Sequence, residues 1–193
     1  MRWVTASGVR HFSLHIAPNL GKRATPVSWV RTFGRKVTIM IIGIPRELLP
    51  GENRVAATPT TVPALLKLGY EVVVEAGAGE HAAQPDRAYE EAGARIVEPG
   101  EAWKADLVLA VNEPTDDQIS LMRAGAVLVT FLHPRQDLAL TEKLAAAGVT
   151  GLSMDMVPRI SRAQSMDALS SMANISGYRA VVEAAFAYGR TFG

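Results

Sequence analysis

Cysteine is absent from this chain of 193 residues. Its absence excludes disulfide bonds, thiolate metal sites and cysteine nucleophiles, and it leaves the redox compartment open. Histidine is scarce, with four scattered residues, so we expect no metal site. No uninterrupted apolar run approaches the roughly 20 residues of a membrane helix, and we expect no direct membrane span. The length suits one globular domain with extensions.

Acidic residues are missing from the start of the chain. Residues 1–39 contain seven Lys or Arg and no Asp or Glu. The other thirteen basic residues stand against all nineteen acidic ones, so the rest of the chain carries a charge of −6 while the whole carries +1. We interpret this basic extension as disordered or as preceding a mis-assigned translation start, with a transit peptide as the alternative. We expect no nucleic-acid binding, because basic and aromatic residues are not interleaved in the rest of the chain.

From Met40 onward, short β-branched runs alternate with longer amphipathic stretches. This pattern predicts an α/β fold with a doubly wound, mostly parallel sheet, Rossmann-like or flavodoxin-like, in an order that the pattern does not fix. Strands are predicted at 40–44, 70–75, 95–97, 106–111, 127–132 and 149–154. Helices are predicted at 60–68, 86–92 and 138–147, and two linking helices close the chain, the last over 175–190. We divide the chain into the extension 1–39, an α/β domain at 40–173 and a linking helix at 174–193.

One glycine motif resembles a dinucleotide-binding loop. Gly77-Ala78-Gly79-Glu80-His81-Ala82 follows a predicted strand and fits the pattern G-x-G-x-x-A. That loop works only if a helix begins within the glycines and directs its amides at the pyrophosphate. Gln84-Pro85-Asp86 indicates a later helix start, so we interpret the motif as a tight turn.

Polar side chains gather between Val157 and Asn174, where a loop enters a helix. A glutamine amide can both donate to and accept from a carboxamide, an aspartate accepts from ribose hydroxyls, and an arginine can hold either group in bidentate geometry. These are the contacts that a nicotinamide nucleotide needs. The structural alternative is an S-x-x-Q capping box with Ser161 at the N-cap and Gln164 at N3.

Three blocks of sequence carry a family resemblance: Gly43–Glu47, Glu52–Pro59 and Val157–Asn174. Through them the chain, from about Met40 to Gly193, resembles the N-terminal part of the alpha subunit of proton-translocating NAD(P) transhydrogenase, in the alanine dehydrogenase/transhydrogenase family. Members of that family begin near Met40. The resemblance implies hydride transfer between NAD(H) on this component and NADP(H) on a partner component, coupled to proton movement by a membrane-spanning component. It further implies a homodimer on the cytoplasmic side, peripheral to the inner membrane.

The same resemblance implies a set of cofactor-binding residues and assigns no catalytic residue. The set consists of Arg159, Gln164, Ser165, Met166, Asp167 and Ser170. In the family, the glutamine lies near the nicotinamide ring, and the arginine, aspartate and final serine form its hydrogen-bond network. The sequence ends where the last helix of the family domain would lead into a Rossmann half that binds most of the NAD. We therefore expect a truncated chain that binds NAD weakly by itself.

Two alternative functions stay open. Alanine dehydrogenase uses an arginine, a lysine and a histidine for pyruvate; Arg54 and His133 are present here, but Asn112 stands where the lysine is expected. Loss of that ammonium group disfavours an amino-acid dehydrogenase fragment. Arg54 can instead form a structural ion pair with Glu47 or Glu52, and His133 can be a loop residue without a ligand. The other alternative is a noncatalytic remnant that dimerises or docks through its last helix, whose apolar stripe suits a neighbouring domain.

Overall fold

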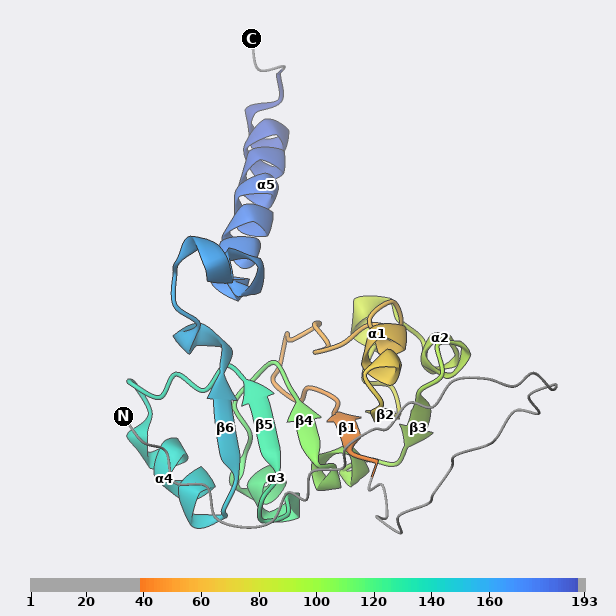
Figure 1. Ribbon diagram of the computed structural model, residues 1–193. Helices are drawn as coiled ribbons and strands as arrows, with labels where there is room; N and C mark the ends of the chain where they lie inside the picture. Colours follow the sequence, from red (N-terminus) through yellow and green to blue (C-terminus); the bar gives the residue numbers. More distant parts are fainter. Residues whose placement is uncertain (1–38, 191–193) are drawn as a thin grey trace, which may run out of the picture. The chain divides into compact units, whose positions relative to one another are not determined.

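The computed structural model describes residues 39–190. Within them, six parallel strands form one sheet in the order β3-β2-β1-β4-β5-β6 (Figure 1). The strands are β1 (Ile41–Ile44), β2 (Glu71–Glu75), β3 (Arg95–Val97), β4 (Leu107–Leu109), β5 (Val127–Thr130) and β6 (Thr150–Ser153). The α-helices are α1 (Val62–Lys67), α2 (Asp86–Glu91), α3 (Asp116–Leu121), α4 (Leu138–Ala146) and α5 (Ala168–Tyr188). The doubly wound parallel sheet predicted from the sequence is confirmed, and its strand order is now known.

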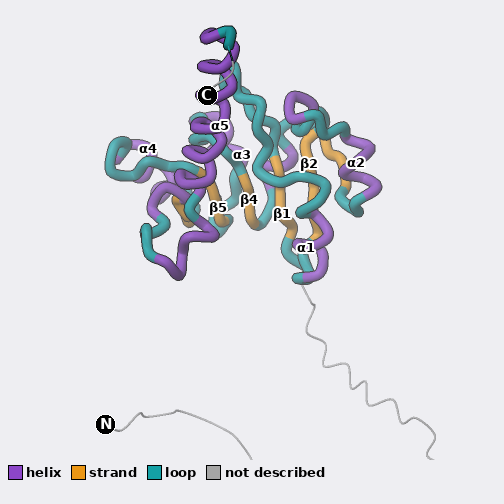
Figure 2. Tube along the Cα trace, turned by 90° about the horizontal axis from the view of Figure 1, so that it is seen from above, coloured by secondary structure: helices purple, strands orange, loops and turns teal. Residues whose placement is uncertain are grey.

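The two faces of the sheet carry different helices. Side chains of β1 and β2 pack on one face against Val62 of α1 and Tyr89 of α2. The register pairs Gly43 with Val108, so Val108 points to the opposite face from Ile42. There it packs against side chains of α3, α4 and the 3₁₀ helix η2 (Glu101–Lys104). Figure 2, seen from above, shows β5, β4, β1 and β2 in a row with helical segments on both sides.

Local side-chain hydrogen bonds are found at the starts of α4 and α2. Asp137 caps α4, and its side chain accepts a hydrogen bond from the Leu140 N–H at 2.9 Å. α2 begins at Asp86, and the Asp86 carboxylate accepts from the Gly77 N–H at 3.0 Å. Gly77 has a φ of 72°, which favours glycine. The interpretation of the G-x-G-x-x-A motif as a turn before a later helix is therefore confirmed.

The C-terminal part differs from the prediction in detail. The 3₁₀ helices η3 (Met154–Met156) and η4 (Ser161–Met166) precede one long helix, α5, in place of two closing α-helices. The Ser161 capping box is wrong, because η4 begins after Ile160 and has no side-chain cap. The cap that the chain does form here is Asp167, which accepts from the N–H groups of Leu169 and Ser170 at the start of α5.

Helix α5 has no buried residue. It begins six residues before the domain boundary predicted at 173/174, and that division into domains stays a prediction. Residues 1–38, which hold all but one residue of the predicted basic extension, lie outside the described part of the chain. In the part that is described, no helix combines the length and the apolar character needed to cross a membrane.

Candidate functional site

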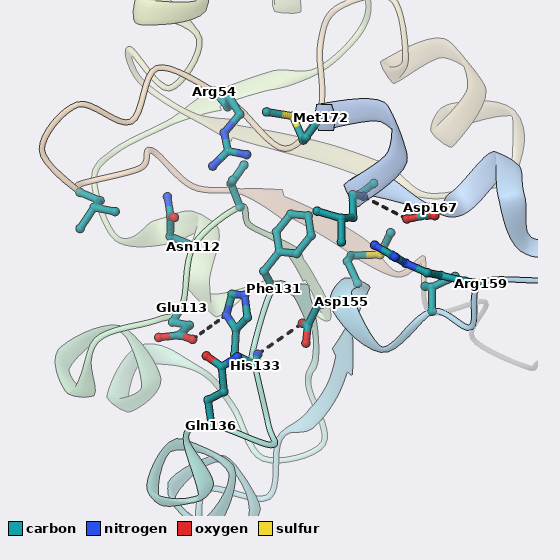
Figure 3. A pocket seen from close by; sticks show the side chains of 16 residues that line it. Arg54, Asn112, Glu113, Phe131, His133, Gln136, Asp155, Arg159, Asp167 and Met172 are labelled. Atoms are coloured by element: carbon teal, nitrogen blue, oxygen red, sulfur yellow. Dashed lines mark hydrogen bonds and ion pairs between the residues drawn. The ribbon is translucent and has the colours of Figure 1, made fainter. Parts of the chain in front are cut away.

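The strand order places a crevice between β1 and β4, where the chain reverses its direction of winding. In doubly wound sheets, ligands bind at this switch point, outside the carboxyl ends of the strands. Here a cavity of about 740 Å³ opens at that place (Figure 3). Its polar lining comes from Arg54, Asn112, Glu113, His133, Gln136, Asp155, Arg159 and Asp167. Its apolar lining comes from Leu49, Val111, Phe131, Met154, Val157, Ala168, Leu169 and Met172.

Glu47, on the loop after β1, ties that loop to the end of β4. Its carboxylate accepts from the Val111 N–H at 2.6 Å and from the Asn112 backbone N–H at 3.3 Å. The Asn112 side-chain Nδ2 donates to the same carboxylate at 2.9 Å. The two loops that flank the switch point are therefore held together by one half-buried side chain.

Glu52 continues this network toward the cavity. It accepts from Asn112 Nδ2 at 3.0 Å, and from Nε and Nη2 of Arg54 at 2.7 and 2.5 Å. The Arg54 hydrogen bond is the main reason that the pKa of Glu52 falls to about 2, although partial burial opposes the change. The ion pair that the sequence suggested for Arg54 exists, and its partner is Glu52. Arg54 also lines the cavity, so the structural and ligand-binding interpretations are compatible.

His133 lies on the loop after β5 and is held by two carboxylates. Its Nδ1 is 3.0 Å from Glu113 Oε1. Its backbone adopts a φ of 43°, unusual outside glycine, and its N–H donates to Asp155 at 3.3 Å. Burial opposes the ionisation of Asp155, but hydrogen bonds from Ser153 and His133 lower its pKa overall. The Phe131 ring stacks on the imidazole with centroids 6.4 Å apart.

Two polar residues of the stretch between Val157 and Asn174 reach the cavity. Arg159 and Asp167 line it from the side of η4 and α5. Asp167 also has a structural role, because it caps α5 and accepts from the Ser170 hydroxyl at 2.6 Å. That bond is the first cause of its lowered pKa, and Arg159 contributes through its charge.

The other four predicted site residues, Gln164, Ser165, Met166 and Ser170, do not line this cavity. Ser165 and Met166 line a second cavity of about 480 Å³, which shares Arg54, Phe131 and Met172 with the first. Gln164 and Ser170 are exposed and line neither of these two cavities. A role for the six residues in cofactor binding stays a prediction.

Sequence reasoning did not identify Glu47, Glu113 or Asp155 as parts of the site. Each lies within four residues of the carboxyl end of a strand, after β1, β4 and β6 respectively. Position at strand ends is the signal that could have found them, but it needs the strand order to say which ends are neighbours.

A doubly wound sheet with a polar, ligand-sized cavity at its switch point defines the chain as a Rossmann-like α/β domain. Residues 43–176 match the family model described as alanine dehydrogenase/PNT, N-terminal domain. The chain therefore belongs to this family.

Sequence and structure comparisons agree with this assignment. The chain is 56% identical over 153 residues to the NAD(P) transhydrogenase subunit alpha of Haemophilus influenzae, covering 79% of this chain. It is 38% identical over 139 residues, or 72% of its length, to the alanine dehydrogenase of Bacillus subtilis. The crystal structure of transhydrogenase from Sinorhizobium meliloti matches 76% of the chain with a TM-score of 0.73 and 45% identity.

The chain corresponds to a minor part of each of these proteins. It spans 30% of the Haemophilus influenzae subunit, 36% of the Bacillus subtilis enzyme and 44% of the Sinorhizobium meliloti chain. The similarity thus concerns one domain.

Proposed function

We propose that this domain is the N-terminal part of the NAD(H)-side component of a proton-translocating NAD(P) transhydrogenase. In this role it takes part in hydride transfer between NAD(H), bound on this side, and NADP(H), bound on a partner component. The observation that carries the proposal is the position of Arg159 and Asp167. They come from the family-specific block and lie together on the wall of the switch-point cavity.

The chemistry of the wall suits a nicotinamide nucleoside. A carboxylate such as Asp167 accepts from ribose hydroxyls, and the fixed guanidinium fork of Arg159 donates to carbonyl or hydroxyl oxygens. Ser170 orients Asp167 through its hydroxyl. Ser165 and Met166 line the adjoining cavity. Gln164 lies on η4, between Arg159 and Asp167 in the sequence. NAD, when bound, supplies the hydride-accepting ring, while these residues bind and orient it.

The coenzyme phosphates need a cradle that residues 39–190 do not show. The G-x-G-x-x-A match at Gly77 forms a turn and a short 3₁₀ helix (Glu80–Ala82), and the next α-helix begins at Asp86. We therefore expect NADH to bind weakly to this chain by itself, with the phosphates held by another domain. A fluorescence titration of NADH that gave a micromolar dissociation constant would contradict this part of the proposal.

The proposed activity can be tested by reconstitution with the NADP(H)-binding and membrane-spanning transhydrogenase components. NADH-dependent reduction of an NADP analogue should appear, and Arg159→Ala should slow it by tenfold or more, because a charged hydrogen bond is lost. Arg162→Ala is the matched control, since Arg162 is exposed and lines neither described cavity. Gln164→Ala should also slow the reaction; an unchanged rate would remove Gln164 from the site. Equal rates for the two arginine variants would refute the role of Arg159.

The finer points of assembly belong to the same proposal. The transhydrogenase relatives are named as subunits, which supports partner components for this chain. We propose that the domain is cytoplasmic, peripheral to the inner membrane through its membrane-spanning partner, and that it forms a homodimer.

A second candidate function is noncatalytic docking, and helix α5 favours it. Its exposed apolar side chains are Leu169, Ile175, Tyr178, Val181, Val182, Phe186 and Tyr188. Phe186 is 86% exposed. Aromatic side chains bury about 150–250 Å² each when covered. Such a stripe could thus supply much of the roughly 800 Å² per partner of a standard interface. Docking without any NADH-dependent rate in the reconstituted system would favour this function.

A further inference from the structure

We propose that Met166 is a site of oxidation by hydroperoxides, and that its oxidation loosens the attachment of residues 154–190 to the sheet. Three methionine side chains that line the second cavity, of about 480 Å³, contribute to this attachment. Oxidation at this site involves no coenzyme, so it is independent of the proposed function.

Methionine is concentrated in the C-terminal part of the chain. Four of the seven methionines lie within residues 154–172: Met154, Met156, Met166 and Met172. Met154 belongs to η3, Met166 to η4 and Met172 to α5, and all three line the second cavity. Met154 and Met172 also line the larger cavity, whereas Met156 lines neither. Thioethers from three successive elements therefore line one cavity.

These methionines help to hold the C-terminal segment on the sheet, because little else of it is buried. η3 and α5 have no buried residue, and η4 has only Ala163. Met154 and Met172 are partly buried, and Figure 3 shows Met172 at the start of α5. The lining that the sheet supplies is apolar and includes Leu109 of β4 and Phe131 after β5. Methionine suits such a place, since its flexible thioether fills irregular gaps and packs well on aromatic rings.

The reaction is the transfer of one oxygen atom to the sulfur of Met166. The O–O bond of the hydroperoxide breaks and an S–O bond forms, so that the thioether is oxidised to a sulfoxide while hydrogen peroxide is reduced to water. The chain has no cysteine, so no thiolate competes for the oxidant. Met166 is 55% exposed and Met122, in the core, is 7% exposed. Because the oxidant must reach the sulfur, we expect Met166 to react about eightfold faster than Met122, the ratio of these exposed fractions.

The sulfoxide is polar and does not suit the apolar lining that the thioether occupies. A polar group that loses water without gaining a hydrogen bond is unfavourable. Of the other polar side chains of the cavity, Arg54 is already bound to Glu52 and Ser171 to a backbone carbonyl. Ser165 is next to Met166 on the same 3₁₀ helix. The oxidised side chain should therefore turn toward water, which removes one of the three thioethers from the cavity.

The test follows each methionine of the full-length chain by NMR, with ¹³C in the methionine methyl groups, during treatment with hydrogen peroxide. The Met166 signal should convert to that of a sulfoxide about eightfold faster than the Met122 signal. As Met166 converts, the methyl signals of Met154 and Met172 should move toward the position of a solvent-exposed methionine. The exposed Met156 methyl group supplies that reference position within the same chain.

Two variants separate the effect of Met166 from general oxidation. Met166→Leu keeps an apolar side chain that cannot form a sulfoxide, so Met154 and Met172 should keep their signals over the period in which wild-type Met166 converts. Met156→Leu is the matched control, because Met156 is 43% exposed, lies in the same segment and lines neither cavity. It should behave like the wild type.

Conversion of Met166 no faster than that of Met122 would overturn the oxidation site. Conversion of Met166 that leaves Met154 and Met172 in place, or equal movement of both in Met166→Leu, would overturn the loosened attachment. The comparison of Met166 with Met122 uses the unaltered chain, so it decides even if a variant fails to fold. No coenzyme is present in these measurements, so their failure would leave the proposed function intact, and absence of hydride transfer would leave the oxidation site intact.

Discussion

Replacement of Glu75 by Gln should change how the stability of the domain depends on pH. Glu75 ends β2 and is 6% exposed, and its Oε2 has no hydrogen-bond partner in the described structure. Burial raises the pKa of this carboxyl above its ordinary value, although the backbone of Gly100 and of Arg46 and the charge of Arg46 oppose the rise. The folded protein therefore holds a proton on Glu75 at pH values where the unfolded chain has released it.

The sign and size of the effect follow from proton linkage. Below about pH 4.3, the ordinary pKa of a glutamate, both states are protonated and Glu75 adds no pH dependence. As the pH rises from there to the folded-state pKa, the unfolded state binds fewer protons, so Glu75 lowers the free energy of unfolding by up to about 1.4 kcal/mol per pH unit. Above the folded-state pKa the loss is complete and constant. Glu75→Gln should remove this decline.

Urea unfolding followed by circular dichroism, from about pH 4.5 to about pH 8, measures the effect. The unfolding free energy of Glu75→Gln minus that of the wild type should increase with pH. Any fixed cost of the new amide cancels in this trend. Glu71→Gln, at the exposed first residue of the same strand, is the control for the substitution itself. A difference between Glu75→Gln and the wild type that does not change with pH would refute the reasoning.

Two further substitutions test the packing that supports the site. Gly43→Ala should destabilise the domain by about 1–3 kcal/mol, because the added Cβ would overlap the Ala102 carbonyl and lie 2.8 Å from Ala105 Cβ. The control is Gly177→Ala on α5, where the added Cβ meets open space, and it should be neutral or stabilising. Equal shifts of the melting temperature for the two variants would contradict this account. Tyr89→Phe should cost about 1–3 kcal/mol in urea unfolding, because the buried Ala57 carbonyl loses the Tyr89 hydroxyl at 2.8 Å; an unchanged midpoint would show that this bond contributes nothing.

Much of the fold could be predicted because its signals are local. Short β-branched runs predicted the positions of the six strands, and longer amphipathic stretches predicted α1, α2 and α4. The short helix α3 is not among the predicted elements, although Thr115 and Gln118 form a capping box of the kind expected at Ser161. The same short motif thus formed a cap in one place and none in the other, because neighbouring contacts decide which backbone conformation follows. Strand order depends on contacts distant in sequence and had no local signal.

The site was predictable only in part for the same reason. Arg159 and Asp167 lie within one block of sequence, and they do reach the cavity. The hydrogen bond between Glu47 and Asn112 joins residues 65 positions apart, and neither segment contains a sequence signal that predicts this contact. The ion pair of Arg54 with Glu52 spans two positions and could be suggested from the sequence, but its place at the switch point required the sheet order.

Because α5 buries none of its side chains, the order of this helix is largely independent of the cooperative unfolding of the sheet. Its amide hydrogens should therefore exchange with deuterium long before those of the central strands. Anything that covers the helix, whether a neighbouring domain or another subunit, will slow that exchange. The exchange rate of the α5 amides therefore reports whether the domain has assembled with a partner, even when the partner is not identified.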